Sequence, residues 1–267
     1  MKAQDLFAKT PVFTHKEFAA SFAGTDRSPR TVDSVLAYHV QAGHILRVRR
    51  GLYVSMPRGA DPKKHPVDPF LLAGRMTPDA VLAYHTALEF HGKAYSVHKQ
   101  LVFLTRLASR PLTFRGHRFR PVPPPKALRD AKNESFGVTT AERAGVPLKL
   151  TSLERTFVDV LDRHDLVGGW EEAWRSLEMV EYFDLDQVVA YALLLGNATT
   201  VAITGLFLEQ HREALMVDDR VLRRLRRRRP RQPHYVERGK KQPSRLVPAW
   251  NLVVPERVLS RAWEESA

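Results

Sequence analysis

Hydrophobic positions at the amino-terminal end of the chain predict two helices. Phe18, Ala19 and Phe22 lie on one helical face, and Thr14 and Glu17 ahead of them have the spacing of a capping box within Val12–Phe22. A second helix is expected from Pro29, a residue favoured at the first helical position, to its end at Gly43. The residues of its buried stripe recur at helical spacing: Val32, Val35, Leu36, His39 and Val40.

Two short β-type runs follow, Ile45–Arg49 and Leu52–Ser55, joined by a tight turn at residues 50–51. The order of two helices and a hairpin is that of a winged helix-turn-helix. In that fold the second helix enters a DNA major groove, and the hairpin lies on the adjoining backbone or minor groove. Because side chains alternate along a strand, Arg47 and Arg49 are expected to share one face.

The remaining pattern predicts a second, mixed domain, so the expected fold class is α+β. The predicted domains are a winged helix-turn-helix at 1–57, an α+β domain at 66–219 and a basic extension at 220–267, with a Pro/Gly/Lys-rich linker at 56–66. A helix is expected within Pro78–His91. Five short runs then predict a small, mainly antiparallel sheet: Leu101–Thr105, Leu112–Phe114, Phe119–Val122, Gly137–Thr140 and Leu148–Leu150.

The carboxy-terminal half of this second domain is expected to be helical. A capping box at Thr151 and Glu154 opens the first of its helices. Three more are expected at Trp170–Tyr182, Asp186–Leu195 and Thr199–Leu215.

The formal charge of +13 is concentrated at two places in the chain. Residues 1–60 carry a net +5, residues 61–219 a net −2 and residues 220–245 a net +11. Such asymmetry indicates a polyanionic partner, and nucleic acid is the first candidate. The basic segment begins as the end of a helix carrying Leu222 and Leu225, and its later part is expected to be extended or disordered. Binding DNA, binding an acidic protein and simple solvation all remain open for it.

Sequence motifs for catalysis are missing. The chain has no cysteine, which excludes disulfides and thiolate sites, and His85 and His91 are not spaced to share one helical face. Asp159, Asp162 and Asp165 could form a carboxylate cluster, but an i, i+4 ion pair between Arg155 and Asp159 is favoured. No phosphate-binding glycine loop occurs either. We therefore expect a binding protein without catalytic residues, metal or cofactor.

The apolar runs of the sequence also indicate where the protein is located. No apolar run approaches the ~20 residues that a membrane span requires, and the amino terminus lacks a signal-peptide pattern. A soluble, cytoplasmic protein without a membrane partner is expected.

Residues near the start of the second helix and in the hairpin are the candidates for DNA contact. The hairpin arginines are suited to phosphates, and Arg30, Thr31, Ser34 and Tyr38 to base edges, although Tyr38 could instead pack against the hairpin. The predicted DNA-binding set is Ser28, Arg30, Thr31, Ser34, Tyr38, Arg47, Arg49 and Arg50.

Three stretches, RVRRGLYV, LAYHTALEFHG and LTSLERTFVDVLDR, occur in this order within residues 10–215. Together they resemble AbiEi-family antitoxins of type IV toxin–antitoxin systems. The motif residues in the third stretch are Thr151, Ser152, Glu154, Arg155, Thr156, Val158 and Asp159. The connection GTDRSPRTV is longer than in the compact version common in the family, and the arginine-rich tail matches no family motif.

The resemblance implies a winged helix-turn-helix that represses its own operon at inverted repeats in double-stranded DNA. It also implies neutralisation of a nucleotidyltransferase toxin of the AbiEii type. The alternatives are a stand-alone transcriptional regulator whose second domain senses a ligand or partner, and a DNA-processing enzyme.

Overall fold

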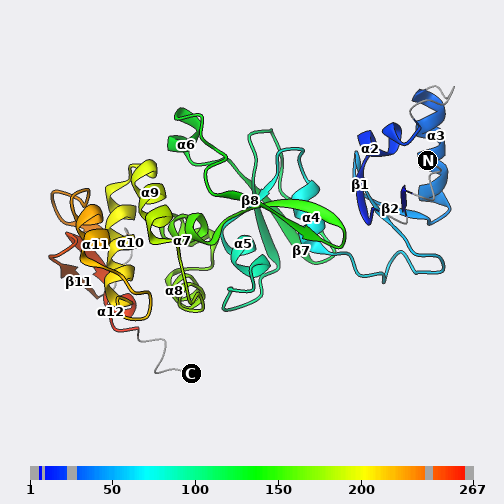
Figure 1. Cartoon of the computed structure of the whole chain (residues 1–267). Helices are drawn as coiled ribbons and strands as arrows, with labels where there is room; N and C mark the ends of the chain where they lie inside the picture. The colour runs from blue at the N-terminus through cyan, green and yellow to red at the C-terminus, as the bar shows by residue number, and fades with distance from the viewer. Residues whose placement is uncertain (1–5, 8–9, 23–28, 238–242, 262–267) are drawn as a thin grey trace. The chain divides into compact units, whose positions relative to one another are not determined.

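The chain forms an α+β structure. The computed structural model describes residues 6–7, 10–22, 29–237 and 243–261, and its elements are labelled in Figure 1. The chain folds into two compact units, and each unit is built from three stretches that alternate along the sequence with those of the other. Unit 1 comprises Met1–Leu82, Lys99–Val122 and Thr140–Lys149, and unit 2 comprises Ala83–His98, Pro123–Thr139 and Leu150–Ala267. The domain boundaries expected from the sequence stay a prediction.

Unit 1 begins with a three-stranded sheet and two helices. The elements are β1 (Val12–Thr14), α2 (His15–Ala20), α3 (Pro29–Gln41), β2 (Ile45–Arg49) and β3 (Leu52–Ser55), and the strand order is β1-β3-β2. The capping box is confirmed: the Glu17 N–H donates to Thr14 Oγ1 at 3.2 Å, and the Thr14 N–H donates to Glu17 Oε2 at 2.7 Å. The sequence prediction did not include β1, which ends at the N-cap residue Thr14, directly before the expected helix.

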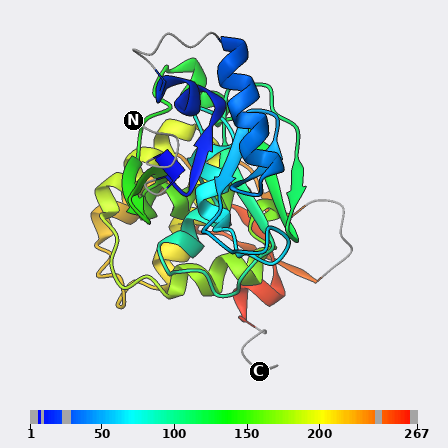
Figure 2. The same ribbon diagram turned by 90° about the vertical axis from the view of Figure 1, so that its right-hand side faces the viewer.

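A small apolar core joins these elements. Phe13 and Phe18 are 0% exposed, and Val32 and Leu36 of α3 are buried with them. The predicted stripe is confirmed at these two positions, whereas its other members, Val35, His39 and Val40, are only half-buried. Tyr53 of β3 stacks on Phe13 with 5.7 Å between ring centroids. In Figure 2, α3 is the long blue helix of this segment. With this stripe in the core, the opposite side of α3 is left for solvent.

The second sheet of the chain has six strands in the order β6-β7-β5-β4-β9-β8. Neighbours β4/β5 and β6/β7 are antiparallel, whereas β5/β7 is parallel. The helix α4 (Pro69–Arg75) is also in unit 1. The strands are β4 (Val81–Leu82), β5 (Gln100–Leu104), β6 (Leu112–Phe114), β7 (His117–Val122), β8 (Val138–Arg143) and β9 (Val146–Thr151).

The helix expected within Pro78–His91 is wrong in its first half. Strand β4 occupies residues 81–82, and α5 begins only at His85 and ends at Phe90. The break lies at Tyr84, whose φ of 56° is incompatible with a right-handed helix. The apolar run before it pairs with β5 instead.

Helices dominate unit 2, as predicted, and Figure 1 shows α7, α9, α10 and α11 side by side. Ser152 caps α7 by accepting the Arg155 N–H at 3.3 Å, so the expected cap at Thr151 was one residue early. No helix in the described part of the chain is long and apolar enough to cross a bilayer. The elements are α6 (Lys126–Asp130), α7 (Leu153–Asp162), η1 (His164–Leu166), α8 (Trp170–Glu178), α9 (Leu185–Leu195), α10 (Ala198–Gln210) and α11 (Asp219–Arg226).

Described residues in the later part of the basic segment belong to a small sheet, which corrects the expectation of disorder for those residues. β10 (His234–Tyr235) and β11 (Ser244–Val247) pair with β12 (Leu252–Pro255), which is followed by α12 (Glu256–Leu259). Between β11 and β12, Trp250 is fully buried, and its indole N–H donates to Glu209 Oε2 of α10 at 2.6 Å. One large aromatic anchor therefore holds the residues that follow the basic segment against α10.

We predict that Gly205→Ala destabilises unit 2 by about 1–3 kcal/mol, because the new methyl overpacks the core. A Cβ at Gly205 would lie 2.1 Å from Trp250 Cη2. Urea unfolding measures the change. In a Trp250→Phe background, where the ring is smaller, the same substitution should cost less. Equal costs in both backgrounds would mean that the indole is not the obstacle.

Candidate nucleic-acid interface

Helix α3 presents most of the predicted base-contacting residues to solvent. Arg30, Thr31 and Ser34 are exposed, and Tyr38 is 60% exposed. The Ser34 hydroxyl donates to the Arg30 carbonyl at 2.9 Å. Tyr38 lies beside the rings of His39 and His44, at 5.4 and 6.2 Å between centroids. The eighth predicted residue, Ser28, lies outside the described residues.

The hairpin arginines do not share one face, which corrects the expectation from strand alternation. Arg47 pairs with Tyr53, but Arg49 pairs with Leu52, and the register shifts between them. This β-bulge takes up Val48 and reverses the alternation. Since Tyr53 and Leu52 are neighbours on β3, they point to opposite faces, and so do the arginines opposite them.

Arg47 and the turn residue Arg50 lie on the same side as α3. Together with His15 they line a groove of about 630 Å³ between the helix and the hairpin. The groove also contains Asp33, which accepts a 2.6 Å hydrogen bond from His15 Nε2 when that nitrogen is protonated. Cationic groups from the hairpin thus face one side of an exposed helix.

Three exposed groove residues of α3 were not among the predicted contacts: Asp33, Ala37 and Gln41. They are exposed and recur every four residues, on the strip of the helix next to Arg30, Ser34 and Tyr38. Their spacing could have identified them. The sequence prediction chose the adjacent strip because it favoured residues near the amino end of the helix, the end that recognition helices point toward base edges.

Arg49 belongs to a different hollow of unit 1. Its neighbours in that hollow include Lys16, Arg75 and Lys149, together with the acid Glu17, which pairs with Arg75. Burial lowers the pKa of the Arg49 guanidinium below its ordinary value. Arg49 is therefore partly withdrawn from solvent and does not line the groove along α3, whereas Arg50 lines both hollows.

The three aspartates near the end of α7 each have a partner of their own. Arg155 Nε donates to Asp159 Oδ2 at 3.3 Å, which confirms the predicted i, i+4 ion pair. Asp162 accepts from Asn197 Nδ2 at 3.0 Å. Asp165 accepts from Arg163 Nε at 2.8 Å. All three carboxylates are therefore engaged in hydrogen bonds or ion pairs within unit 2.

Three potential metal ligands in unit 2, His85, His98 and Glu172, lie within 4.8 Å of one another, a grouping that the sequence prediction missed. The two imidazoles stack almost parallel, with centroids 3.6 Å apart. Ligand nitrogens of parallel stacked rings do not converge on one point, as coordination of a shared ion requires. His98 is remote from His85 in sequence, so spacing alone could not reveal the pair.

Hydrogen bonds already saturate the carboxylate of this group. Glu172 Oε1 accepts from the Ser96 N–H, from Ser176 Oγ and, when protonated, from His85 Nε2, each at 3.1 Å. Ser96 Oγ donates to Oε2 at 2.6 Å. Burial alone raises the pKa of Glu172, but the hydrogen bonds from His85 and Ser96 outweigh it and lower the pKa to about 2. Glu172 is therefore a buried anion held by hydrogen-bond donors on three neighbouring residues.

Comparison with known proteins finds a similar fold. No protein-family model matches the chain, and no curated protein matches it. The crystal structure of the RV2827C protein from Mycobacterium tuberculosis is similar, with a TM-score of 0.62 and 17% sequence identity. The match covers 98% of this chain and 93% of that one. At this identity the two chains are shown to share a fold, across nearly their whole lengths.

We predict that Glu172→Gln lowers the free energy of unfolding by about 2 kcal/mol at neutral pH, because hydrogen bonds to a charged acceptor are lost. The lowered pKa also fixes the pH dependence. Stability from ionised Glu172 is complete above the ordinary value of 4.5 and is lost as pH falls to about 2.

The difference between the wild type and this variant should therefore shrink across that window, as followed by urea unfolding. Glu171→Gln is the matched control, since its side chain is 54% exposed and pairs with Arg175 at the surface. If Glu172→Gln behaves like this control, the carboxylate does not stabilise unit 2.

Proposed function

We propose that the protein binds double-stranded DNA through a winged helix-turn-helix at positions 1–57, with α3 as the recognition helix and the β2–β3 hairpin as the wing. The observation that carries this proposal is the groove in which Arg47 and Arg50 face α3. Arginines on a hairpin beside an exposed helix can neutralise phosphates while the helix contacts base edges. The net charge of +5 over residues 1–60 favours the same partner.

We propose further that the protein is an antitoxin that represses its own operon and counteracts a nucleotidyltransferase toxin. This part rests on the resemblance of three stretches to AbiEi-family antitoxins. The central residues of the third stretch, Arg155, Thr156 and Asp159, are at most 1% exposed. Because they are buried, these residues contribute to the packing of unit 2, and a toxin would contact other, exposed residues.

The DNA-binding proposal predicts unequal roles for the hairpin arginines. Arg47→Ala combined with Arg50→Ala should weaken binding to the DNA upstream of the gene and reduce the salt slope of log Kobs by about 2, because two phosphate contacts are lost. Fluorescence anisotropy at several salt concentrations measures both quantities.

Arg49→Ala is the matched control, because this arginine lies on the other face of the hairpin. It should change affinity less than either groove substitution. Wild-type affinity no better for the upstream fragment than for a scrambled one would refute a specific repressor. A dominant effect of Arg49→Ala would assign DNA to the opposite face.

The antitoxin proposal predicts rescue in cells. Expression of the adjacent open reading frame should arrest growth, and co-expression of this protein should restore it. The Arg47→Ala/Arg50→Ala variant should rescue equally well, because the proposed toxin-neutralising region lies beyond the hairpin. Continued arrest with both proteins present would contradict the antitoxin role, and rescue only by the wild type would tie neutralisation to DNA binding.

A further inference from the structure

A second pocket of unit 1 involves the end of α3 that follows Tyr38. It has a volume of about 640 Å³, within the range of small-molecule sites. Phe7, Pro11, Met56 and Pro57 form an apolar wall. This composition suits a flat hydrocarbon body rather than a solvated ion.

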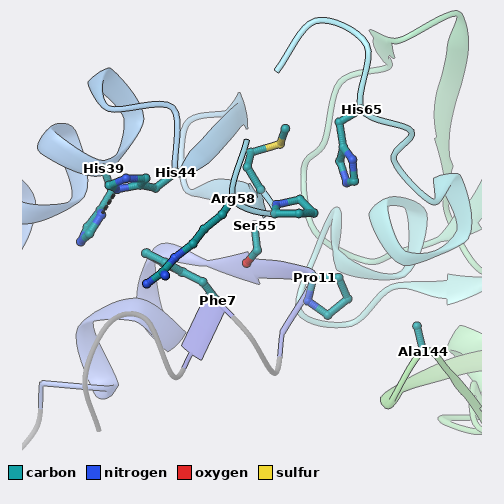
Figure 3. Close-up of a pocket in the computed structure, with 10 residues that line it drawn as sticks. Phe7, Pro11, His39, His44, Ser55, Arg58, His65 and Ala144 are labelled. Atoms are coloured by element: carbon teal, nitrogen blue, oxygen red, sulfur yellow. Dashed lines mark hydrogen bonds between the residues drawn. The ribbon is translucent and has the colours of Figure 1, made fainter. Parts of the chain in front are cut away.

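Among the described residues, the charged and titratable side chains that line this pocket are all basic. Three imidazoles, those of His39, His44 and His65, and the guanidinium of Arg58 line it, and among the described residues no acidic side chain does. Figure 3 shows Arg58 and Phe7 toward the side where His39 and His44 lie, with His65 and Ala144 toward the other. An apolar wall beside an arginine and several imidazoles is a composition that can bind an organic anion.

The pair of imidazoles adds a specific electrostatic feature. His39 Nδ1 and His44 Nδ1 are 3.1 Å apart, so one proton between them satisfies both nitrogens. Burial, and then the charge of His44, lower the pKa of His39. A bound anion would offset the repulsion between two imidazolium groups and promote uptake of a second proton.

The groups that contact the pair do not supply that negative charge. The rings contact Tyr38 and Phe7, and Arg58 of the same pocket is cationic. An acid, Asp61, lines a neighbouring hollow with His44 and Arg58. Its Oδ1 accepts the Lys63 N–H at 2.8 Å. Among the described residues that line this pocket itself, the side with His39 and His44 therefore offers donors and no carboxylate.

We infer that this pocket is a binding site for a small aromatic anion, a carboxylate or a phosphate ester, whose occupation changes DNA binding through α3. His39 belongs to α3, and the adjacent Tyr38 is a proposed DNA contact whose ring lies 5.4 Å from it. A ligand that orders His39 would alter the position of Tyr38. Coupling of this kind is reciprocal, so DNA would change ligand affinity by the same factor. The regulatory half of this inference rests on the proposed DNA-binding function, whereas the ligand-binding half does not.

The binding half is tested by calorimetric titration of the full chain with benzoate and phenyl phosphate, and with benzyl alcohol as the neutral analogue. Both anions should bind at one site per chain, and the alcohol at least about tenfold more weakly, since each tenfold step is about 1.4 kcal/mol. Affinity for the anions should be higher at about pH 6 than at about pH 8, because protonated imidazoles are favoured there.

Arg58→Gln should reduce anion affinity about tenfold or more. It is exposed, so the fold should survive the change. Arg110→Gln, another exposed arginine of unit 1, is the matched control and should leave affinity unchanged. Lack of saturable anion binding, equal binding of benzyl alcohol, or equal effects of the two substitutions would overturn the site.

The regulatory half is tested by operator binding at constant ionic strength, with chloride replaced by benzoate. Wild-type affinity should shift on replacement, and Arg58→Gln should abolish the shift. Unchanged DNA affinity at saturating benzoate would overturn the coupling. If the protein binds no DNA at all, the proposed function fails and the coupling with it, while the titration still decides the site.

Discussion

A guanidinium buried completely in unit 2 is the constraint on which its organisation depends. Arg155 is 0% exposed, and its Nη1 donates to the carbonyls of Glu134 and Phe136 at 2.8 and 2.7 Å. Asp159, one helical turn later, supplies the counter-charge and accepts a further 2.6 Å bond from the Tyr191 hydroxyl. Because an unpaired charge is costly in an apolar interior, these groups hold the 134–136 loop, α7 and α9 in one arrangement.

The same constraint gives the residues of the LTSLERTFVDVLDR stretch a structural role inside unit 2. Gly137 has a φ of 58°, and a Cβ at this position would lie 2.8 Å from Arg155 Cβ. Only glycine therefore fits where the chain runs alongside the buried arginine. Ser152 caps the helix that carries Arg155, and its backbone N–H donates to the Gly137 carbonyl at 2.8 Å. These residues depend on one another, because each contacts the others in the interior of unit 2. They therefore determine how unit 2 packs, whereas recognition of a partner requires residues at the surface.

Local patterns predicted the elements whose cause is local. The capping box at Thr14 and the ion pair within α7 depend on residues three or four positions apart, and both occur. The buried stripe of α3 has the same spacing and is buried at Val32 and Leu36. The predictions that failed depend on residues remote in sequence or on backbone geometry. The bulge at Val48 depends on the register with β3, and Trp250 is buried against α10, a helix much earlier in the chain. In the candidate interface, seven of the eight predicted residues are described, but alternation alone put Arg49 on the wrong face.

Helix α3 gives unit 1 two surfaces that cannot be altered independently. Its Asp33, Ala37 and Gln41 line the groove with the hairpin arginines, whereas His39 lines the pocket with Phe7 and Arg58. The buried stripe through Leu36 fixes the helix between them. A rigid helix transmits a rotation or shift at one surface directly to the other, because packed interiors resist continuous deformation. The proposed ligand site and the proposed DNA-binding surface therefore share one helix of unit 1.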